Sequence, residues 1–462
     1  MRNFLFVLLA VIGGYPLIGQ STFQKTIGGD GRDVGYSIVA TTDGHMIISG
    51  VTTSFENSKE VYVIKMDTLG NKIWSRVYGS NRVEIAVKME ATPDGGVVIL
   101  GDASGKGIGI KDILIIKLDA NGKLQWARSY GGELNDYGLD IHATTDGGYI
   151  AVGETNSFDA WDHDILLMKL RGNGDVEWGR IIGADTVDFA NSVIEVEDGY
   201  VMAGETNSFG DNEDILLVKV NKKGELQWSK AIGDTLNDNQ DDLIRDTDST
   251  FVLVGSTESY GFKQREILFL RVGLTGHVEL AKTYGGDLAD EPKTIKRLED
   301  GYVIGGFSNS WNENVTEEDA YLIRTNLDGS LRYSKTFGGQ HNDFMWSLDV
   351  FKEGFFVMTG ITNSFSEREE DHFLYVLKTP DKRKILNCEM TNVQTISLKL
   401  KPEQMHEHEV GLKVRPVEII QTDYSKIEMR EVDDQILDVC TDGIYYKDVE
   451  TEEDDSGIIQ FD

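Results

Sequence analysis

The chain has 462 residues, of which 78 are acidic and 45 are basic, so its formal net charge is −33 at pH 7. Binding to a phosphate backbone needs clustered Lys and Arg, and this charge therefore argues against nucleic acids and anionic membrane surfaces as partners. A chain of this length can hold two or three average domains, or one large all-β domain with an appendage.

The N-terminal residues resemble a secretory signal. In MRNFLFVLLAVIGGYPLIGQS, one Arg precedes an apolar run of about a dozen residues, and small or polar residues follow it. We predict that residues 1–19 are a signal peptide and that the mature chain starts near Gln20. No Cys follows the apolar run to carry a lipid, and no later stretch is long and apolar enough to cross a bilayer, so we expect no membrane insertion.

One sequence pattern recurs seven times between about residue 23 and about residue 386, with a period of roughly fifty-two residues. The third copy, Ala127 to Trp178, is the clearest. It holds four strand-like runs, Tyr137–Thr144, Tyr149–Thr155, Asp164–Leu170 and Asp175–Ile182, which we call strands A to D. A period of this length indicates a propeller or a solenoid.

Turn signals separate the strands of each copy. The A–B connection carries an Asp-Gly pair in five copies, which predicts a tight type I′ hairpin with positive φ at both central residues. Strand B contains a glycine in all seven copies, and such a residue weakens a strand unless another backbone comes close. We expect this close backbone near the central axis, where the blades crowd together. These glycines are Gly50, Gly101, Gly153, Gly204, Gly255, Gly306 and Gly360.

Seven small sheets without helices can bury their apolar faces only against one another, and radial packing does this. The sequence therefore predicts an all-β fold, a seven-bladed β-propeller of four-stranded antiparallel blades, over residues 20–390. Ser21–Gly29 and Lys382–Asn387 both resemble strand D. We predict that the N-terminal segment completes the seventh blade, because Ile27-Gly28-Gly29 matches Tyr130-Gly131-Gly132. Closure by the C-terminal segment is the alternative.

The recurrent pattern YGG…D…DGGY…G.T.S…D..L.K.D..G…W resembles that of β-propeller repeat proteins that bacteria export, over nearly four fifths of the chain. The segment Leu118–Trp126 also resembles the Trp-bearing turn of quinoprotein-like propellers, although its spacings are not those of the sialidase Asp-box. The resemblance implies the fold and a place in the bacterial periplasm, at the cell surface or in the medium. For activity it implies only a binding or scaffold role.

Residues that recur in every copy are expected to serve the blade. Acidic residues precede strand A and open strand C in all seven copies, and we expect them to cap turn amides. The alternative is that acidic loops such as Asp211–Asp214 or Asp238–Asp242 hold Ca²⁺, although neither has the full ligand spacing of a known calcium motif. We predict no cofactor and leave Ca²⁺ open.

Function is expected where the copies differ. Three of the seven tryptophans, Trp161, Trp311 and Trp346, do not hold the repeat position in strand D. They map to the face made by the D–A and B–C loops, together with His163 and His341. Aromatic rings among acids suit an apolar sugar face or a protein loop, so these five residues are the predicted binding site for an extracellular protein or glycan. Unrelated substitution on a tolerant surface is the alternative.

Strand A also carries polar residues that we expect to face the channel. They form either the wet lining of a propeller pore, which we favour, or an active-site cluster. These residues are Lys88, Asp140, His142, Asp242, Lys296 and Asp349.

No nucleophile elbow, zinc-binding His-Glu-x-x-His or phosphate loop occurs in the sequence. A pair of acids for glycoside hydrolysis carries no information in so acidic a chain, because some pair falls at the required separation by chance. We therefore predict a secreted, non-enzymatic binding or scaffold module that uses the D–A and B–C loop face. The alternative is a carbohydrate-active enzyme, a glycoside hydrolase or lyase-like protein with paired carboxylates at the channel mouth.

The last part of the chain, residues 391–462, differs in character from the repeats. Segments such as ISLKLKP and VGLKVRPVEII indicate extended structure, and the end is acidic. We predict an acidic tail with two or three strands against the outside of the propeller. Both cysteines, Cys388 and Cys440, lie near or within this tail. In an oxidising compartment we expect them to form a disulfide, and two unpaired thiols are the alternative.

Overall fold

The computed structural model describes residues 20–445, apart from gaps at 56–57, 81, 106–108, 161, 262–263, 312–315, 352–353, 366–371, 382–389, 393–395, 402–404, 406 and 424–426. Within these ranges the chain forms β-strands and their connections, and none of it is a helix of the length and apolarity that a membrane span requires.

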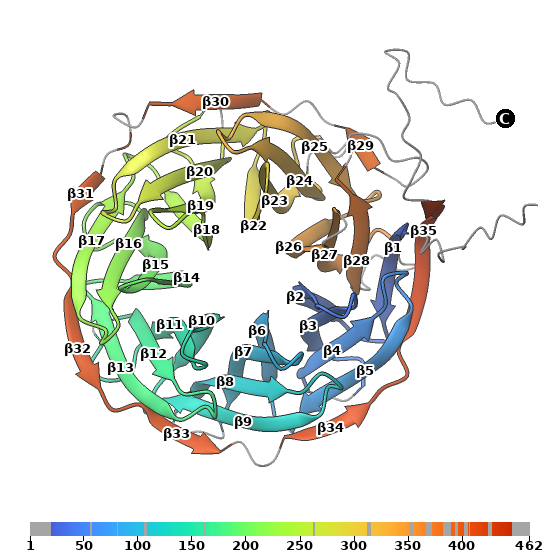
Figure 1. Cartoon of the computed structure of the whole chain (residues 1–462), viewed down its shortest axis with the longest axis horizontal. Coiled ribbons are helices and arrows are strands. Elements are labelled where there is room, and N and C mark those ends of the chain that lie inside the picture. Colours follow the sequence, from blue (N-terminus) through green and yellow to red (C-terminus); the bar gives the residue numbers. More distant parts are fainter. Residues whose placement is uncertain are drawn as a thin grey trace, which may run out of the picture.

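Seven blades surround a central channel, as Figure 1 shows. The predicted seven-bladed all-β propeller is confirmed. In every blade four antiparallel strands run outward from the channel, in the order A to D.

The strands have the following bounds. Blade 1 contains β2 (Asp33–Ala40), β3 (Met46–Thr52), β4 (Glu60–Met66) and β5 (Lys72–Gly79). Blade 2 contains β6 (Glu84–Ala91), β7 (Val97–Ser104), β8 (Lys111–Leu118) and β9 (Leu124–Gly131). Blade 3 contains β10 (Asp136–Ala143), β11 (Tyr149–Thr155), β12 (Asp164–Leu170) and β13 (Val176–Gly183). Blade 4 contains β14 (Asp188–Val196), β15 (Gly199–Thr206), β16 (Asp214–Asn221) and β17 (Leu226–Ile232). Blade 5 contains β18 (Asp238–Arg245), β19 (Thr250–Thr257), β20 (Glu266–Gly273) and β21 (Val278–Gly285). Blade 6 contains β22 (Asp290–Leu298), β23 (Gly301–Ser308), β24 (Asp319–Asn326) and β25 (Leu331–Phe337). Blade 7 contains β26 (Asp343–Phe351), β27 (Phe355–Thr362), β28 (Phe373–Pro380) and β1 (Gln20–Gly28).

The ring is closed by its N-terminal strand. Strand β1 pairs antiparallel with β28, with Phe23 opposite Lys378 and Ile27 opposite Leu374. Phe23 and Ile27 are buried in the apolar cluster between blades 7 and 1. The first strand of the described chain therefore serves as strand D of the last blade.

The C-terminal region adds a fifth strand to the outer edge of every blade, and Figure 1 shows these seven strands as an outer circle. We call them the belt. The prediction of two or three strands was too low, because most belt strands have only three to five residues and show too little alternation to be recognised. The belt strands and their partners are β29 (Met390–Asn392) on β25, β30 (Ile396–Leu400) on β21, β31 (Glu407–Glu409) on β17, β32 (Lys413–Val417) on β13, β33 (Ile420–Asp423) on β9, β34 (Glu428–Glu431) on β5 and β35 (Gln435–Tyr445) on β1.

Apolar side chains between the belt strands enter the grooves between blades. Met405, Leu412, Ile419 and Ile427 are buried, each in a different apolar cluster, and follow one another at intervals of seven, seven and eight residues. We call these four residues the belt knobs. Their spacing matches the step from one blade to the next. The belt therefore has a short repeat of its own, with one unit for each blade that it crosses.

The acidic residues that open strand A cap the preceding turn, as predicted. Asp136 accepts hydrogen bonds from the backbone N–H of Gly132 (2.8 Å) and from the Ser157 (3.0 Å) and Thr155 hydroxyls. The same pattern explains why Gly-Gly, Asp and Thr-x-Ser recur together. Glu84 accepts hydrogen bonds from the Ser80 backbone N–H (3.3 Å) and hydroxyl, since blade 2 has Ala103 and Gly105 in place of Thr and Ser. The residues that make contacts equivalent to those of Asp136 are Asp33, Asp188, Asp238, Asp290 and Asp343.

The A–B turns are not of type I′, and this prediction was wrong. Gly147 has φ +82°, but Asp146 does not have positive φ; among the described non-glycine residues only Phe158 and Asp159 do. The Gly147 N–H donates to the Thr144 carbonyl (2.9 Å), which fits a type I turn followed by a left-handed glycine. Asp146 is thereby placed to form an ion pair with Lys169 of strand C, with 2.9 Å between Lys169 Nζ and Asp146 Oδ2.

Each strand A contains a bulge that accounts for the glycine in strand B. In blade 3 the pairing skips Leu139, and a Cβ added to Gly153 would lie 1.9 Å from the Tyr137 carbonyl oxygen. The close backbone is therefore the bulged neighbour in the same blade, and not a crowded axis as predicted. The bulge residues are Tyr36, Val87, Leu139, Asn191, Asp241, Lys293 and Trp346.

Candidate functional site

Four of the five predicted binding residues are described, and their contacts do not overlap. Trp161 lies outside the described residues. His163 is half-buried, with Nδ1 3.4 Å from a Glu154 carboxylate oxygen. The half-buried Trp311 packs on Tyr321 at 5.0 Å between ring centroids and joins the apolar cluster between blades 5 and 6. His341 donates its backbone N–H to Ser364 Oγ (3.0 Å).

The cysteine prediction also falls outside what the structure describes. Cys388 lies in a gap, and only the backbone of Cys440 is described, within β35. The proposed disulfide stays a prediction.

Trp346 is the predicted residue that belongs to a larger group. It stacks on Phe344 (5.9 Å between ring centroids) and meets Phe307 edge-on (5.8 Å), and Tyr36 lies 6.2 Å away. We call these four residues the aromatic arc. They come from blades 6, 7 and 1 and lie in the half of the channel nearer the D–A and B–C loops. Tyr36, Phe344 and Trp346 are partly exposed, whereas Phe307 is 7% exposed.

The indole N–H of Trp346 has no hydrogen-bond partner among the described residues, although its nitrogen is buried. A buried donor without a partner is rare and is destabilising by about 1–3 kcal/mol. An oxygen acceptor on a bound molecule would satisfy this group.

Acidic residues take the equivalent places on the other side of the channel. The residue after the strand B glycine is Phe307 in blade 6, but Asp102, Glu154 and Glu205 in blades 2, 3 and 4. We call these three acids the acidic arc. Burial raises the pKa of all three carboxyls, that of Glu205 to about 7.

Lys293, a bulge residue, lies between the two arcs. Its ammonium is 2.7 Å from Asp241 and 5.5 Å from the centre of the Phe307 ring. On this side of the channel, aromatic residues therefore gather in blades 6, 7 and 1 and acidic residues in blades 2, 3 and 4, where Asp102 and Glu205 are only 6% and 8% exposed. A comparison of the residues at the bulge and after the strand B glycine, copy by copy, is the sequence signal that could have found both arcs.

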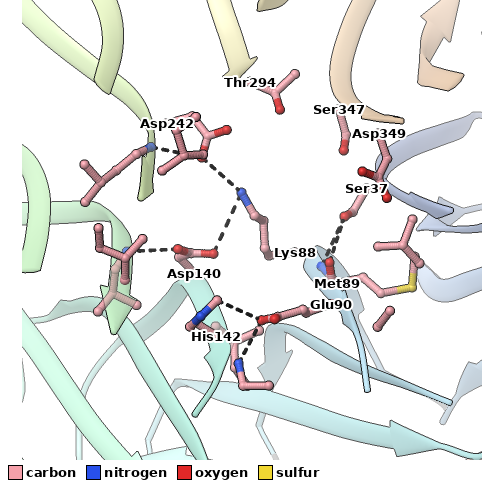
Figure 2. Close-up of a pocket in the computed structure, with 18 of the residues that line it drawn as sticks. Ser37, Lys88, Met89, Glu90, Asp140, His142, Asp242, Thr294, Ser347 and Asp349 are labelled. Atoms are coloured by element: carbon pink, nitrogen blue, oxygen red, sulfur yellow. Dashed lines mark hydrogen bonds and ion pairs between the residues drawn. The ribbon is translucent and has the colours of Figure 1, made fainter. Parts of the chain in front are cut away.

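The half of the channel nearer the A–B turns holds a separate cavity of about 580 Å³, lined by strand A of all seven blades. The six polar strand A residues predicted to face the channel all line it. At its centre the Lys88 ammonium lies 3.8 Å from Asp140 and 3.6 Å from Asp242, which come from blades 3 and 5 (Figure 2). Burial lowers the pKa of Lys88, but the two aspartates raise it more, so Lys88 stays charged.

None of the described residues form a group of three or more His, Cys, Asp or Glu side chains that could hold a metal ion. No protein-family model matches the chain, and a search of curated proteins finds no match.

Mild acidification should stabilise the folded protein. Burial raises the pKa of the capping carboxyls Asp238, Asp290 and Asp343 to about 6, well above the ordinary value of 3.8 for an aspartate. The folded state then binds protons more readily than the unfolded state between about pH 4 and pH 6, so stability is lost as pH rises through this window. We expect a melting temperature several degrees higher at pH 5 than at pH 8, measured by calorimetry.

The double variant D290N/D343N should show a smaller gain at pH 5, because two of the titrating groups are gone. Asp146 sets the lower limit of the pH range in which acidification is stabilising. Burial raises its pKa, but the hydrogen bonds of Thr144 and Lys169 lower it to about 2, so its contribution is lost only in strong acid. A melting temperature that falls between pH 8 and pH 5 would contradict this assignment.

Proposed function

We propose that this protein is a secreted, non-enzymatic binding or scaffold module of a bacterial cell envelope, which engages an extracellular protein or glycan at its D–A and B–C loop face. Seven-bladed propellers commonly serve as binding or scaffold modules. The apolar N-terminal segment and the resemblance of the repeat to exported propellers support export.

The aromatic arc is the observation that carries the proposal. Tyr36 and Trp346 stand at the bulge, where the other blades have Val, Leu, Asn, Asp or Lys, and Phe307 stands where blades 2, 3 and 4 have acids. The repeat therefore does not require an aromatic ring at these places. Tyr36, Phe344 and Trp346 keep part of their rings exposed, and aromatic side chains in such surroundings dominate the energy of many interfaces. Of the acidic arc, Asp102 and Glu205 are only 6% and 8% exposed, so the partly exposed Glu154 is the acceptor that we expect for a glycan hydroxyl or a peptide N–H.

A carbohydrate-active enzyme is the alternative function. Such an enzyme needs two carboxyl groups facing a substrate about 5–5.5 Å or about 6.5–9.5 Å apart. The acids at this mouth already have partners. Asp102 accepts the Gly138 N–H (2.9 Å) and Glu205 accepts the Asn239 amide (2.9 Å). We therefore favour binding without catalysis.

The test is retention of the full chain on a panel of immobilised polysaccharides, with retained protein and released sugar both measured. We expect retention without release, and we expect W346A to weaken it about thirtyfold, as for loss of a hot-spot residue. L69A is the matched control, since Leu69 is 42% exposed on the opposite face.

The outcomes separate the alternatives. Released sugar would favour the enzyme. Equal retention of W346A and the native chain would place the site elsewhere. If no polysaccharide retains the protein, pull-downs from envelope fractions, with W346A as the control bait, test a protein partner.

A further inference from the structure

The first residue after the bulge in strand A forms a ring around the channel, and its members differ in charge. Four blades have a small hydroxyl residue there, whereas blades 2, 3 and 5 have Lys88, Asp140 and Asp242, which we call the charged triad. The four hydroxyl residues are Ser37, Ser192, Thr294 and Ser347.

A hydroxyl group at this position is sufficient to join strand A of one blade to strand A of the next. Ser37 Oγ accepts the backbone N–H of Met89 in the next blade (3.2 Å), and Ser347 Oγ accepts that of Ile38 (3.2 Å). Asp140 and Asp242 make the same connection with one carboxylate oxygen each, at 2.9 Å. The second oxygen of each is not needed to join the blades, and that of Asp242 accepts the backbone N–H of Leu243 in its own strand (3.1 Å).

The two aspartates are therefore not explained by stability. Each is only 6% exposed, and removing a carboxylate from water is destabilising unless it is fully paired. The contacts of Lys88 at 3.6 and 3.8 Å are longer than the 2.7–2.9 Å of a good charged hydrogen bond. Figure 2 shows Lys88 between the two carboxylates, with open space beside it.

The other charged groups of the cavity balance one another. Glu90 lies 3.3 Å from His142, and Asp349 lies 4.0 Å from Lys296. Burial lowers the pKa of His142, but the hydrogen bond and charge of Glu90 raise it more. At the mouth, Glu195 pairs with Lys222 and Arg245 with Asp248. The triad has two carboxylates and one ammonium, so it carries one net negative charge when both carboxylates are ionised. Burial raises the pKa of Asp140, and the Lys88 ammonium opposes this rise.

We propose that this cavity binds a small organic cation, with a primary ammonium group against Asp140 and Asp242 and a short alkyl chain toward the A–B turns. Apolar side chains line the route that the alkyl chain would take, among them Val39, Ile194 and Ile244. The cavity of about 580 Å³ suits a small molecule, and the described residues supply too few ligands for a bare metal ion.

The experiment is calorimetric titration of the full chain with 1,4-diaminobutane in 0.15 M salt. Butane-1,4-diol, which has the same length without charge, is the control ligand. We expect the diamine to bind and the diol not to bind. D242S keeps the hydroxyl acceptor found in other blades and should weaken diamine binding at least tenfold.

K88S should change binding in the opposite direction. Without the Lys88 ammonium both carboxylates lack a counter-charge, so the diamine should bind at least tenfold more tightly and should raise the melting temperature of this variant more than that of the native chain. If K88S does not fold alone, recovery of soluble protein when the diamine is present replaces the titration.

Three results would overturn the proposal. They are no binding of the diamine at millimolar concentration, equal binding of the diol, and equal binding to D242S and the native chain. Equal binding to D242S and the native chain is the result expected if the diamine were attracted only by the acidic surface of the protein. W346A should bind the diamine normally, because the aromatic arc lies in the other half of the channel, so this test is independent of the proposed function.

Discussion

A chain that ends at Asp381, and so lacks the belt, should aggregate and should melt at least about 10 °C below the native chain. Loss of the belt leaves the outer edges of the seven D strands without hydrogen-bond partners, and such open strand edges pair with other chains. It also opens the grooves that the four belt knobs fill. Burial of one such side chain contributes about 1.5–3 kcal/mol.

Light scattering after size-exclusion chromatography, together with calorimetry, measures both effects. The control is the full-length variant M405A/L412A, which removes two belt knobs but leaves the belt strands in place. It should stay monomeric and melt at a lower temperature than the native chain. A shortened chain that is monomeric with an unchanged melting temperature would show that the belt is dispensable.

Replacing a strand B glycine should be the most harmful single substitution in the blades. In G153A the new methyl carbon would lie 1.9 Å from the Tyr137 carbonyl oxygen, which is backbone and has no rotamer to adopt. The bulge or the sheet must shift, and we expect the free energy of unfolding to fall by about 3 kcal/mol. G101A should behave alike, since its methyl would lie 1.7 Å from the Ile85 carbonyl oxygen.

Urea unfolding measures this loss, and G411A is the matched control. A Cβ at Gly411 meets no atom within 4 Å, and its φ is not positive. Alanine there should be neutral or stabilising by a few tenths of a kcal/mol, because it restricts the unfolded chain. Equal effects of G153A and G411A would mean that the bulge does not impose the glycine.

The fold could be predicted because the same short patterns recur in every copy. Gly131, Gly132, Asp136, Thr155 and Ser157 form one hydrogen-bonded turn, and most other copies keep most of this set, although blade 2 departs from it. The bulge could not be predicted from one strand, because it depends on how strand A pairs with strand B. Its only trace in the sequence is the strand B glycine, which was attributed to the wrong neighbour.

The belt escaped prediction for a different reason. Its strands are too short for alternation to be significant, and they have no partner within the tail. The signal that could have shown it is the spacing of Met405, Leu412, Ile419 and Ile427, which repeats once per blade.

The candidate site could be predicted only in part. Trp346 was selected because it departs from the repeat, and the structure places it at the centre of the aromatic arc. Phe307, Phe344 and Tyr36 were missed, because aromatic residues in strands are ordinarily expected to pack in the core. Trp311, selected by the same reasoning as Trp346, does pack there.

The position of β1 has a consequence for the order in which the molecule forms. This strand lies between β28 and β35, and the Tyr375 hydroxyl donates to Gln24, a residue 351 positions away in the chain. The first strand of the described residues thus obtains both of its neighbours only after nearly all the other described strands have been synthesised. Contacts so distant in sequence form slowly. Blades 1 to 6 can assemble from local hairpins, so we expect the pairing of β1 with β28 and β35 to be a late step.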